Sequence, residues 1–133
     1  MRQGVKRISI WILAAAFVPT GAIACRGRQQ SVFDQARTLT GGDPGKGMLA
    51  IDKYGCGGCH TIPGVNGANA TVGPPLNNIA SRTVLGGHLT NTPPNMELWI
   101  KKPQQIDPKN VMPDLGVTDQ DAKDITAYLY TLR

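Results

Sequence analysis

Apolar residues recur three or four positions apart in three segments of the chain, which is the spacing of one face of an α-helix. The repeating residues are Met48 and Ile51, with Ala50 or Tyr54 beside them, in residues 44–54; Met96, Trp99 and Ile100 in residues 95–102; and Ala122, Ile125, Leu129 and Leu132 in residues 118–132. A shorter segment, residues 76–83, has the same character, and no segment alternates as a strand would. The pattern predicts an all-α fold of three to five helices.

The ends of these helices carry recognisable signals. Asp43 can cap the first helix because its carboxylate accepts hydrogen bonds from free amides, and Pro44 suits the first helical position. Thr118, with Asp121 three positions later, forms a variant of the capping box before the last helix. Pro103 is expected to end the middle helix.

Two long segments, residues 61–75 and 103–117, are rich in Gly, Asn and Pro and are predicted to be loops. Loops of this length usually count against a compact assignment. Aromatic residues make up only 5% of the chain, so one small domain would also have a thin core. A large apolar cofactor wrapped by the loops would account for both features.

The sequence Cys56-Gly57-Gly58-Cys59-His60 indicates which cofactor. Cys-x-x-Cys-His is the attachment sequence of a c-type haem, in which two thiols form thioethers to one porphyrin and the histidine ligates the iron. The two glycines leave the short loop open, so the backbone can lie close to the macrocycle. We expect one covalently bound haem c, held by Cys56 and Cys59, with His60 as an iron ligand.

Two other uses of a Cys-x-x-Cys pair remain open. A structural zinc site needs four ligands, and beyond the motif only Cys25 and His88 remain, without a second close pair. A redox-active dithiol is typical of a βαβ context, which the flanking sequence does not show. Both are weaker than the haem interpretation.

Residues 1–24 resemble an export signal peptide. A positively charged start is followed by an apolar run over residues 8–18, by Pro19, and by a small-x-small cleavage site at residues 22–24. A retained membrane anchor is the weaker interpretation, because a spanning helix needs about 20 apolar residues. Export agrees with the motif, since c-type haem is attached on the outer side of the bacterial cytoplasmic membrane.

Cys25 follows this site directly and is the odd one of three cysteines. Residues 22–25 resemble a bacterial lipobox, with alanine where leucine is usual, so we expect Cys25 to be lipidated and to anchor the protein to the membrane. The alternative is a free or intermolecularly bonded thiol. Residues 25–42 lack a sustained pattern and are predicted to be a lipid-anchored or flexible tether, with at most a short turn near residues 32–37. The folded domain then spans residues 43–133.

The formal charge is +5, but the predicted signal carries three basic residues, and removing it leaves 11 Lys and Arg against 9 Asp and Glu, or +2. No basic run interleaved with aromatic residues is present, so we expect no nucleic-acid partner.

Four side chains are candidates for the ligand opposite His60. Met48 is close to the motif on the preceding helix, and Met96 shares a face with apolar residues, so both are expected in the core. Met112 lies in the proline-rich loop, which can direct a side chain at the iron, and is the preferred ligand. His88, in a Gly-rich loop, is expected to be solvated or to lie near a propionate.

Residues 44–133 resemble the class I cytochromes c. The markers, in order, are Gly47, Tyr54, the haem motif, Gly73-Pro74, Trp99, Pro103, Val111-Met112-Pro113 and Ala127-Tyr128-Leu129. The resemblance implies a class I fold around one covalent haem, with Trp99 in the haem pocket and the first and last helices crossing near Gly47. It also implies that Pro74 offers its carbonyl to the non-ligating nitrogen of His60.

Residues 80–100 look most like the cytochrome c domain of subunit II of some bacterial haem-copper oxidases, here with an export signal in place of a copper-binding module. We expect an exported electron-transfer protein, not an enzyme and without a small-molecule substrate, in the periplasm or on the outer face of the cytoplasmic membrane. Its partners would be redox proteins of a respiratory or periplasmic chain, such as a terminal oxidase or a dehydrogenase. The alternatives are a dedicated haem subunit of such a complex and, less favoured, a peroxidase-like enzyme with an open iron site.

Overall fold

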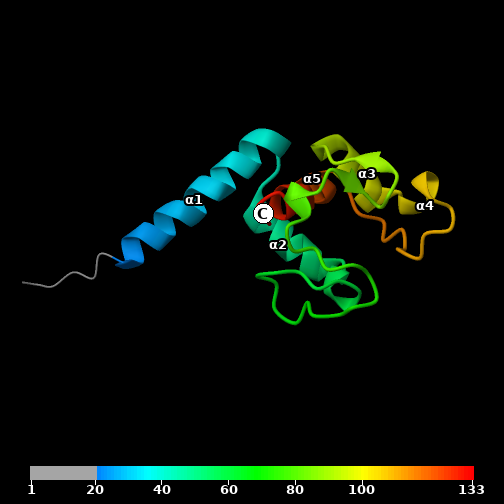
Figure 1. Ribbon diagram of the computed structural model, residues 1–133, viewed down its shortest axis with the longest axis horizontal. Helices are drawn as coiled ribbons and strands as arrows, with labels where there is room; N and C mark the ends of the chain where they lie inside the picture. Colours follow the sequence, from blue (N-terminus) through cyan, green and yellow to red (C-terminus); the bar gives the residue numbers. More distant parts are fainter. Residues whose placement is uncertain (1–20) are drawn as a thin grey trace, which may run out of the picture.

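The computed structural model describes residues 21–133, so most of the predicted signal peptide lies outside the described residues. The elements are α1 (Gly21–Thr40), α2 (Pro44–Lys53), the single 3-10 turns η1 (Cys56–Gly58) and η2 (Ile79–Ser81), the strands β1 (Val84–Leu85) and β2 (Leu89–Thr90), α3 (Pro93–Lys101), α4 (Pro103–Ile106) and α5 (Asp119–Leu129). The described part is mainly helical with long connecting loops, as predicted (Figure 1).

The start of α2 is capped as the sequence indicates. The Oδ1 atom of Asp43 accepts hydrogen bonds from the amides of Gly45 at 2.8 Å and Lys46 at 3.1 Å, and Pro44 opens the helix. The bond from the Lys46 amide, helped by the Arg37 guanidinium, holds the pKa of the Asp43 carboxyl below its usual value. Because Arg37 lies on α1, this cap also ties the end of α1 to the start of α2.

The pair of helices α2 and α5 is at the centre of the domain, and they make more extensive contact with each other than any other pair of elements. At their closest approach a Cβ on Gly47 would collide with the backbone carbonyl of Asp124 and touch Tyr128 Cβ. Glycine is therefore required at position 47 by space, and this close packing of the first and last domain helices at Gly47 is the one the sequence predicts.

Polar contacts fasten both ends of this helix pair. Near the start of α2, the Asp43 amide donates to Asp124 Oδ1 at 2.7 Å. Near its end, Asp121 accepts from Lys53 Nζ at 2.9 Å and from the Tyr54 hydroxyl at 2.7 Å. The bond from Lys53, followed by the one from Tyr54, lowers the pKa of the Asp121 carboxyl. The hydrogen bonds at these two ends hold α2 against α5 along its length, just before the haem motif.

Helix α5 is buried on nearly every side, because α1, α2 and α3 all pack against it. Every residue from Asp124 to Leu129 is buried, with Ile125, Tyr128 and Leu129 in the main core. From α3, Met96 and Ile100 join the same core, as their spacing predicts. The Thr118 hydroxyl accepts from the Asp121 amide at 3.2 Å, which confirms the predicted cap.

The segment predicted to be an irregular tether is instead helical. Helix α1 runs over twenty residues, and its C-terminal end packs onto the domain, where Ala36 is only 1% exposed. Figure 1 shows the other end of α1 extending away from the domain. The sequence does not reveal this helix because only two of residues 28–40, Ala36 and Thr40, are buried, so the helix needs few apolar positions. The lipidation of Cys25, which lies within the bounds of α1, stays a prediction.

Three local expectations were wrong. Met48 is 37% exposed on α2 and does not lie in the core. The helix expected over residues 76–83 is only the turn η2, because Asn78 adopts a left-handed conformation (φ 55°) and Arg82 an extended one. Residues 84–90 form a small antiparallel hairpin, whose strands of two residues are too short to show alternation in the sequence.

Within residues 21–133, none of the helices combines the length and the apolar character that a membrane crossing requires.

We predict that Gly47→Ala destabilises the domain by about 1–3 kcal/mol, the usual range for overpacking a core. The direction of the change in unfolding free energy tests the close approach, since glycine-to-alanine changes inside helices ordinarily stabilise by roughly 0.5–1 kcal/mol. Denaturant unfolding of the haem-loaded protein measures the difference. Lys46→Ala, at an exposed neighbouring position, is the control and should change stability by less than about 0.5 kcal/mol. A stabilised Gly47→Ala protein would contradict the close helix approach.

Candidate haem site

The haem motif forms one tight turn directly after α2. Gly55, with φ of 69°, turns the chain into η1, and the carbonyl of Cys56 accepts from the amides of Cys59 at 3.2 Å and His60 at 3.0 Å. Both thiols are unpaired and half-buried. Burial raises the pKa of the Cys56 thiol, so this cysteine is not activated as a redox thiolate. The turn therefore presents two thiols and one imidazole from five consecutive residues.

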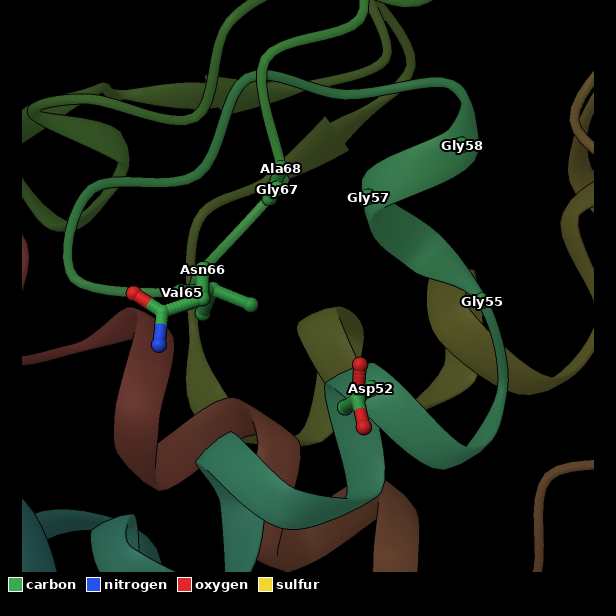
Figure 2. A pocket seen from close by; sticks show the side chains of 8 residues that line it. All are labelled: Asp52, Gly55, Gly57, Gly58, Val65, Asn66, Gly67 and Ala68. Atoms are coloured by element: carbon green, nitrogen blue, oxygen red, sulfur yellow. The ribbon is translucent and has the colours of Figure 1, made fainter.

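The following loop folds back against the rear of this turn. The Ile62 amide donates to the Ala68 carbonyl at 2.9 Å, and Thr61 pairs with Asn69. Ala68 lies so close to Gly57 that a Cβ on Gly57 would touch it at 2.9 Å. Figure 2 shows the hollow between the turn and this loop, with Asp52 at its edge; it measures about 200 Å³. This is less than the roughly 300 Å³ of the smallest usual ligand pockets, so it is not a cofactor site.

His60 is held in one orientation by the segment that begins at Gly73. Its Nδ1 atom lies 2.7 Å from the carbonyl oxygen of Pro74. A carbonyl can only accept, so Nδ1 must carry the proton and Nε2 keeps its lone pair for a metal. The Gly73 amide donates to the Cys59 carbonyl and the Leu76 amide to the Thr61 carbonyl, both at 2.8 Å, so the whole segment is paired with the motif.

Gly73 and Arg82 complete this support. A Cβ on Gly73 would collide with the imidazole ring of His60, so the ring occupies the space that a side chain would fill. The Nη2 atom of Arg82 donates to the carbonyls of Pro75 and Asn77, which holds the next part of the segment in place. The role of Arg82 was not predicted from the sequence, since no local pattern links it to residues 75–77.

Trp99 lies beside the β1–β2 hairpin. Its ring stacks on that of His88, with centroids 6.5 Å apart, and approaches Gly86 so closely that a Cβ there would overlap it. His88 is about half exposed, as expected, and its Nε2 atom lies 3.5 Å from Asp107 Oδ2. The structure thus places Trp99 and His88 in one cluster. Their relation to the haem stays a prediction.

Met112 is half-buried in the loop between α4 and α5. Its amide donates to Asn110 Oδ1 at 2.9 Å, and its carbonyl accepts from Gln104 Nε2. Both partners were missed from the sequence. The Asn-x-Met spacing is typical of a side chain that bonds the backbone two residues later, and could have indicated Asn110; nothing in the sequence singles out Gln104.

The residues present fit a covalent haem. The thiols are free, and the imidazole is locked with its second nitrogen available. Large apolar side chains also lie exposed beside the predicted contacts: Val72 precedes Gly73, Leu98 precedes Trp99, and Val111 precedes Met112. A flat apolar macrocycle is the kind of group that such side chains enclose. Among residues 28–133, whose side chains the structure describes, no three His, Cys, Asp or Glu side chains gather as a metal cluster.

A family profile for cytochrome c matches residues 45–133, from the first turn of α2 to the last residue. The chain belongs to the cytochrome c family. Its cytochrome c domain binds a covalent haem c with its iron. The assignment of the two thioethers to Cys56 and Cys59, and of the iron ligands to His60 and Met112, stays a prediction from the residues.

The cytochrome c domain is also similar to a protein described as cytochrome c oxidase subunit 2 from Alkalihalophilus pseudofirmus (strain ATCC BAA-2126 / JCM 17055 / OF4), with 34% identity over 89 residues. That match covers 66% of this chain and 25% of the relative, so the chain spans about a quarter of the relative's length. No solved structure gives a significant match.

We predict that Gly73→Ala disturbs the His60 side of this cytochrome c. The added Cβ would push the imidazole away from the Pro74 carbonyl. Less haem should then be incorporated, and the protein that does form should show a shifted Soret band in absorption spectra. Thr71→Ala is the matched control, because position 71 is exposed, lies two residues before Gly73 and is outside the haem motif. Equal spectra and equal haem content in the two variants would argue against the role of Gly73.

Proposed function

We propose that this chain is a membrane-tethered monohaem cytochrome c that carries single electrons in a bacterial respiratory or periplasmic redox chain. When bound, the haem iron supplies the chemistry, taking up and releasing one electron between its ferric and ferrous states. The observation that supports the proposal is the His60–Pro74 hydrogen bond of 2.7 Å, which holds His60, the proposed iron ligand, in one orientation and tautomer.

Met112 is the proposed ligand opposite His60. A histidine and methionine pair closes both faces of the iron and raises its reduction potential. The polypeptide holds the two ligands on separate supports: His60 on the motif turn and residues 73–76, and Met112 on the loop after α4. Ligands held in this way would change little between oxidation states, which favours fast electron transfer and disfavours binding of a substrate at the iron.

The electron would pass through the haem edge near the thioethers. Gly58 at this point is exposed and has open space around it, so a partner protein can approach closely. Most acidic side chains of the described residues are paired with a basic one, as in Lys53–Asp121, Lys101–Asp119 and Lys102–Asp114. We therefore expect docking to depend less on salt than it does for a strongly basic carrier.

The tether of this proposal runs through α1. The sixteen positions from residue 25 to residue 40 lie within α1, and at about 1.5 Å per residue they span roughly 24 Å. A lipid on Cys25 would then hold the domain at the outer face of the cytoplasmic membrane through a helix. The similarity to an oxidase subunit 2 favours one second candidate, a dedicated haem subunit of an oxidase or dehydrogenase complex. Purification with a copper- or molybdenum-containing subunit would distinguish it from a free carrier.

We predict that Met112→Ala removes the weak far-red sulfur-to-iron absorption band of the ferric protein. Its ferrous form should gain carbon monoxide binding because one face of the iron opens. Met96→Leu, which changes a buried methionine of the core, is the control and should retain the band. A peroxidase-like site predicts high-spin spectra and ligand binding before any substitution; that result in the unaltered protein would contradict the carrier proposal.

We predict that the mature protein begins at Cys25 and carries a diacylglyceryl group. Intact-mass measurement of protein purified from membranes should show the added lipid mass, and Cys25→Ser should release the protein from the membrane fraction. An unmodified thiol at the N-terminus would contradict the lipid anchor without affecting the haem proposal.

A further inference from the structure

The two backbone polar groups of Met112 are both bonded to side chains. Asn110 Oδ1 accepts from the Met112 amide at 2.9 Å, and Gln104 Nε2 donates to the Met112 carbonyl. Asn110 is part of the same loop and moves with it. Gln104 belongs to α4, so its hydrogen bond is the one that connects the residue to the body of the domain.

The backbone around Gln104 is held by burial and by a hydrogen bond. Gln104 follows Pro103, whose side chain is fully buried, and only Lys102 lies between Pro103 and the end of α3. The Gln105 amide donates to the Lys102 carbonyl at 3.1 Å, which turns the chain from α3 into α4. The amide group of Gln104 is therefore presented at a defined place at the α3–α4 corner, eight residues before the carbonyl that it holds.

The loop around Met112 has little apolar contact to fix it. Val111 is 87% exposed, and Pro113, Leu115 and Gly116 are exposed as well. The other connection to the corner is the ion pair between Lys102 and Asp114 at 2.7 Å, whose side chains are 46% and 38% exposed. Exposed ion pairs contribute about 0–1 kcal/mol, so this one holds the loop weakly. The hydrogen bond from Gln104 is thus the main polar connection at Met112 itself.

We propose that Gln104 is a positioning residue that holds the Met112 loop in the arrangement in which the thioether sulfur can reach the iron. The proposal rests on the proposed ligation by Met112. Without the Gln104 hydrogen bond, the loop would release its methionine more often and leave the iron open on that face. Losing one hydrogen bond of about 1–1.4 kcal/mol corresponds to a fivefold to tenfold larger open fraction.

The test uses Gln104→Glu in the haem-loaded full-length protein. The substitution keeps the shape of the side chain but places a carboxylate against the Met112 carbonyl, so a donor becomes an acceptor. At neutral pH the ferric far-red band should weaken, and the ferrous protein should bind carbon monoxide five to ten times faster.

Gln105→Glu is the matched control. It adds the same charge at the adjacent, exposed position, so effects of net charge on the whole domain appear in both variants. The inference is supported if only Gln104→Glu changes the band and carbon monoxide binding. It is overturned if the two variants have the same band and the same binding rate, or if Gln104→Glu lowers only the thermal midpoint.

The Met112→Ala protein separates this inference from the proposed function. If the unaltered protein lacks the band, or if Met112→Ala keeps it, the proposed ligation fails. If Met112→Ala loses the band while Gln104→Glu matches Gln105→Glu, the ligation stands and only the role of Gln104 is refuted.

Discussion

The close approach of α2 to α5 at Gly47 is the constraint on which the rest of the domain depends. The haem motif begins three residues after α2 ends, so the position of α2 on α5 decides where the thiols and the imidazole lie. The far end of α5 acts on the same region, since the Tyr128 hydroxyl donates to the Pro63 carbonyl at 2.7 Å and so holds the loop behind the motif turn. Burial raises the pKa of Tyr128, which keeps this hydroxyl a donor. One helix contact therefore places the motif, and one hydroxyl holds the loop that supports it.

The two sides of the site are built by different means. On the His60 side, the supporting segment is paired with the motif through backbone hydrogen bonds, and the chain between them is short. Such a unit depends mainly on the backbone, on the space left by Gly73 and on the Arg82 side chain that holds residues 75–77. On the Met112 side, the loop is held by side chains from the α3–α4 corner and is largely exposed. The Met112 side is thus held mainly by side chains, and it is the side expected to open first when the protein is heated.

The sequence was sufficient for features that depend on neighbouring residues. The caps at Asp43 and Thr118, the core face of α5 and the haem motif are all local patterns, and each is present in the structure. Prediction from the sequence failed where packing between distant segments determines the structure. Helix α1 lacks a sustained apolar stripe because Ala36 and Thr40 are the only buried positions among residues 28–40, and Met48 is exposed although its spacing matches the core face. The hydrogen bond from Gln104 to Met112 joins α4 to a loop eight residues later, and no spacing rule predicts it. His60 and Pro74 are fourteen residues apart, and their contact was expected from the family resemblance, not from a pattern of residues.

The helical form of α1 has a consequence for geometry. A flexible tether limits only the distance between the two groups that it joins. A helix also sets their relative orientation, because each residue turns the chain by about 100°. Ala36 and Thr40 are buried at the domain end of α1, so this end is fixed relative to α5. Whatever is joined to the other end therefore faces the domain at an angle set by the number of residues in between. One residue more or less would change the direction in which the haem edge points while hardly changing its distance.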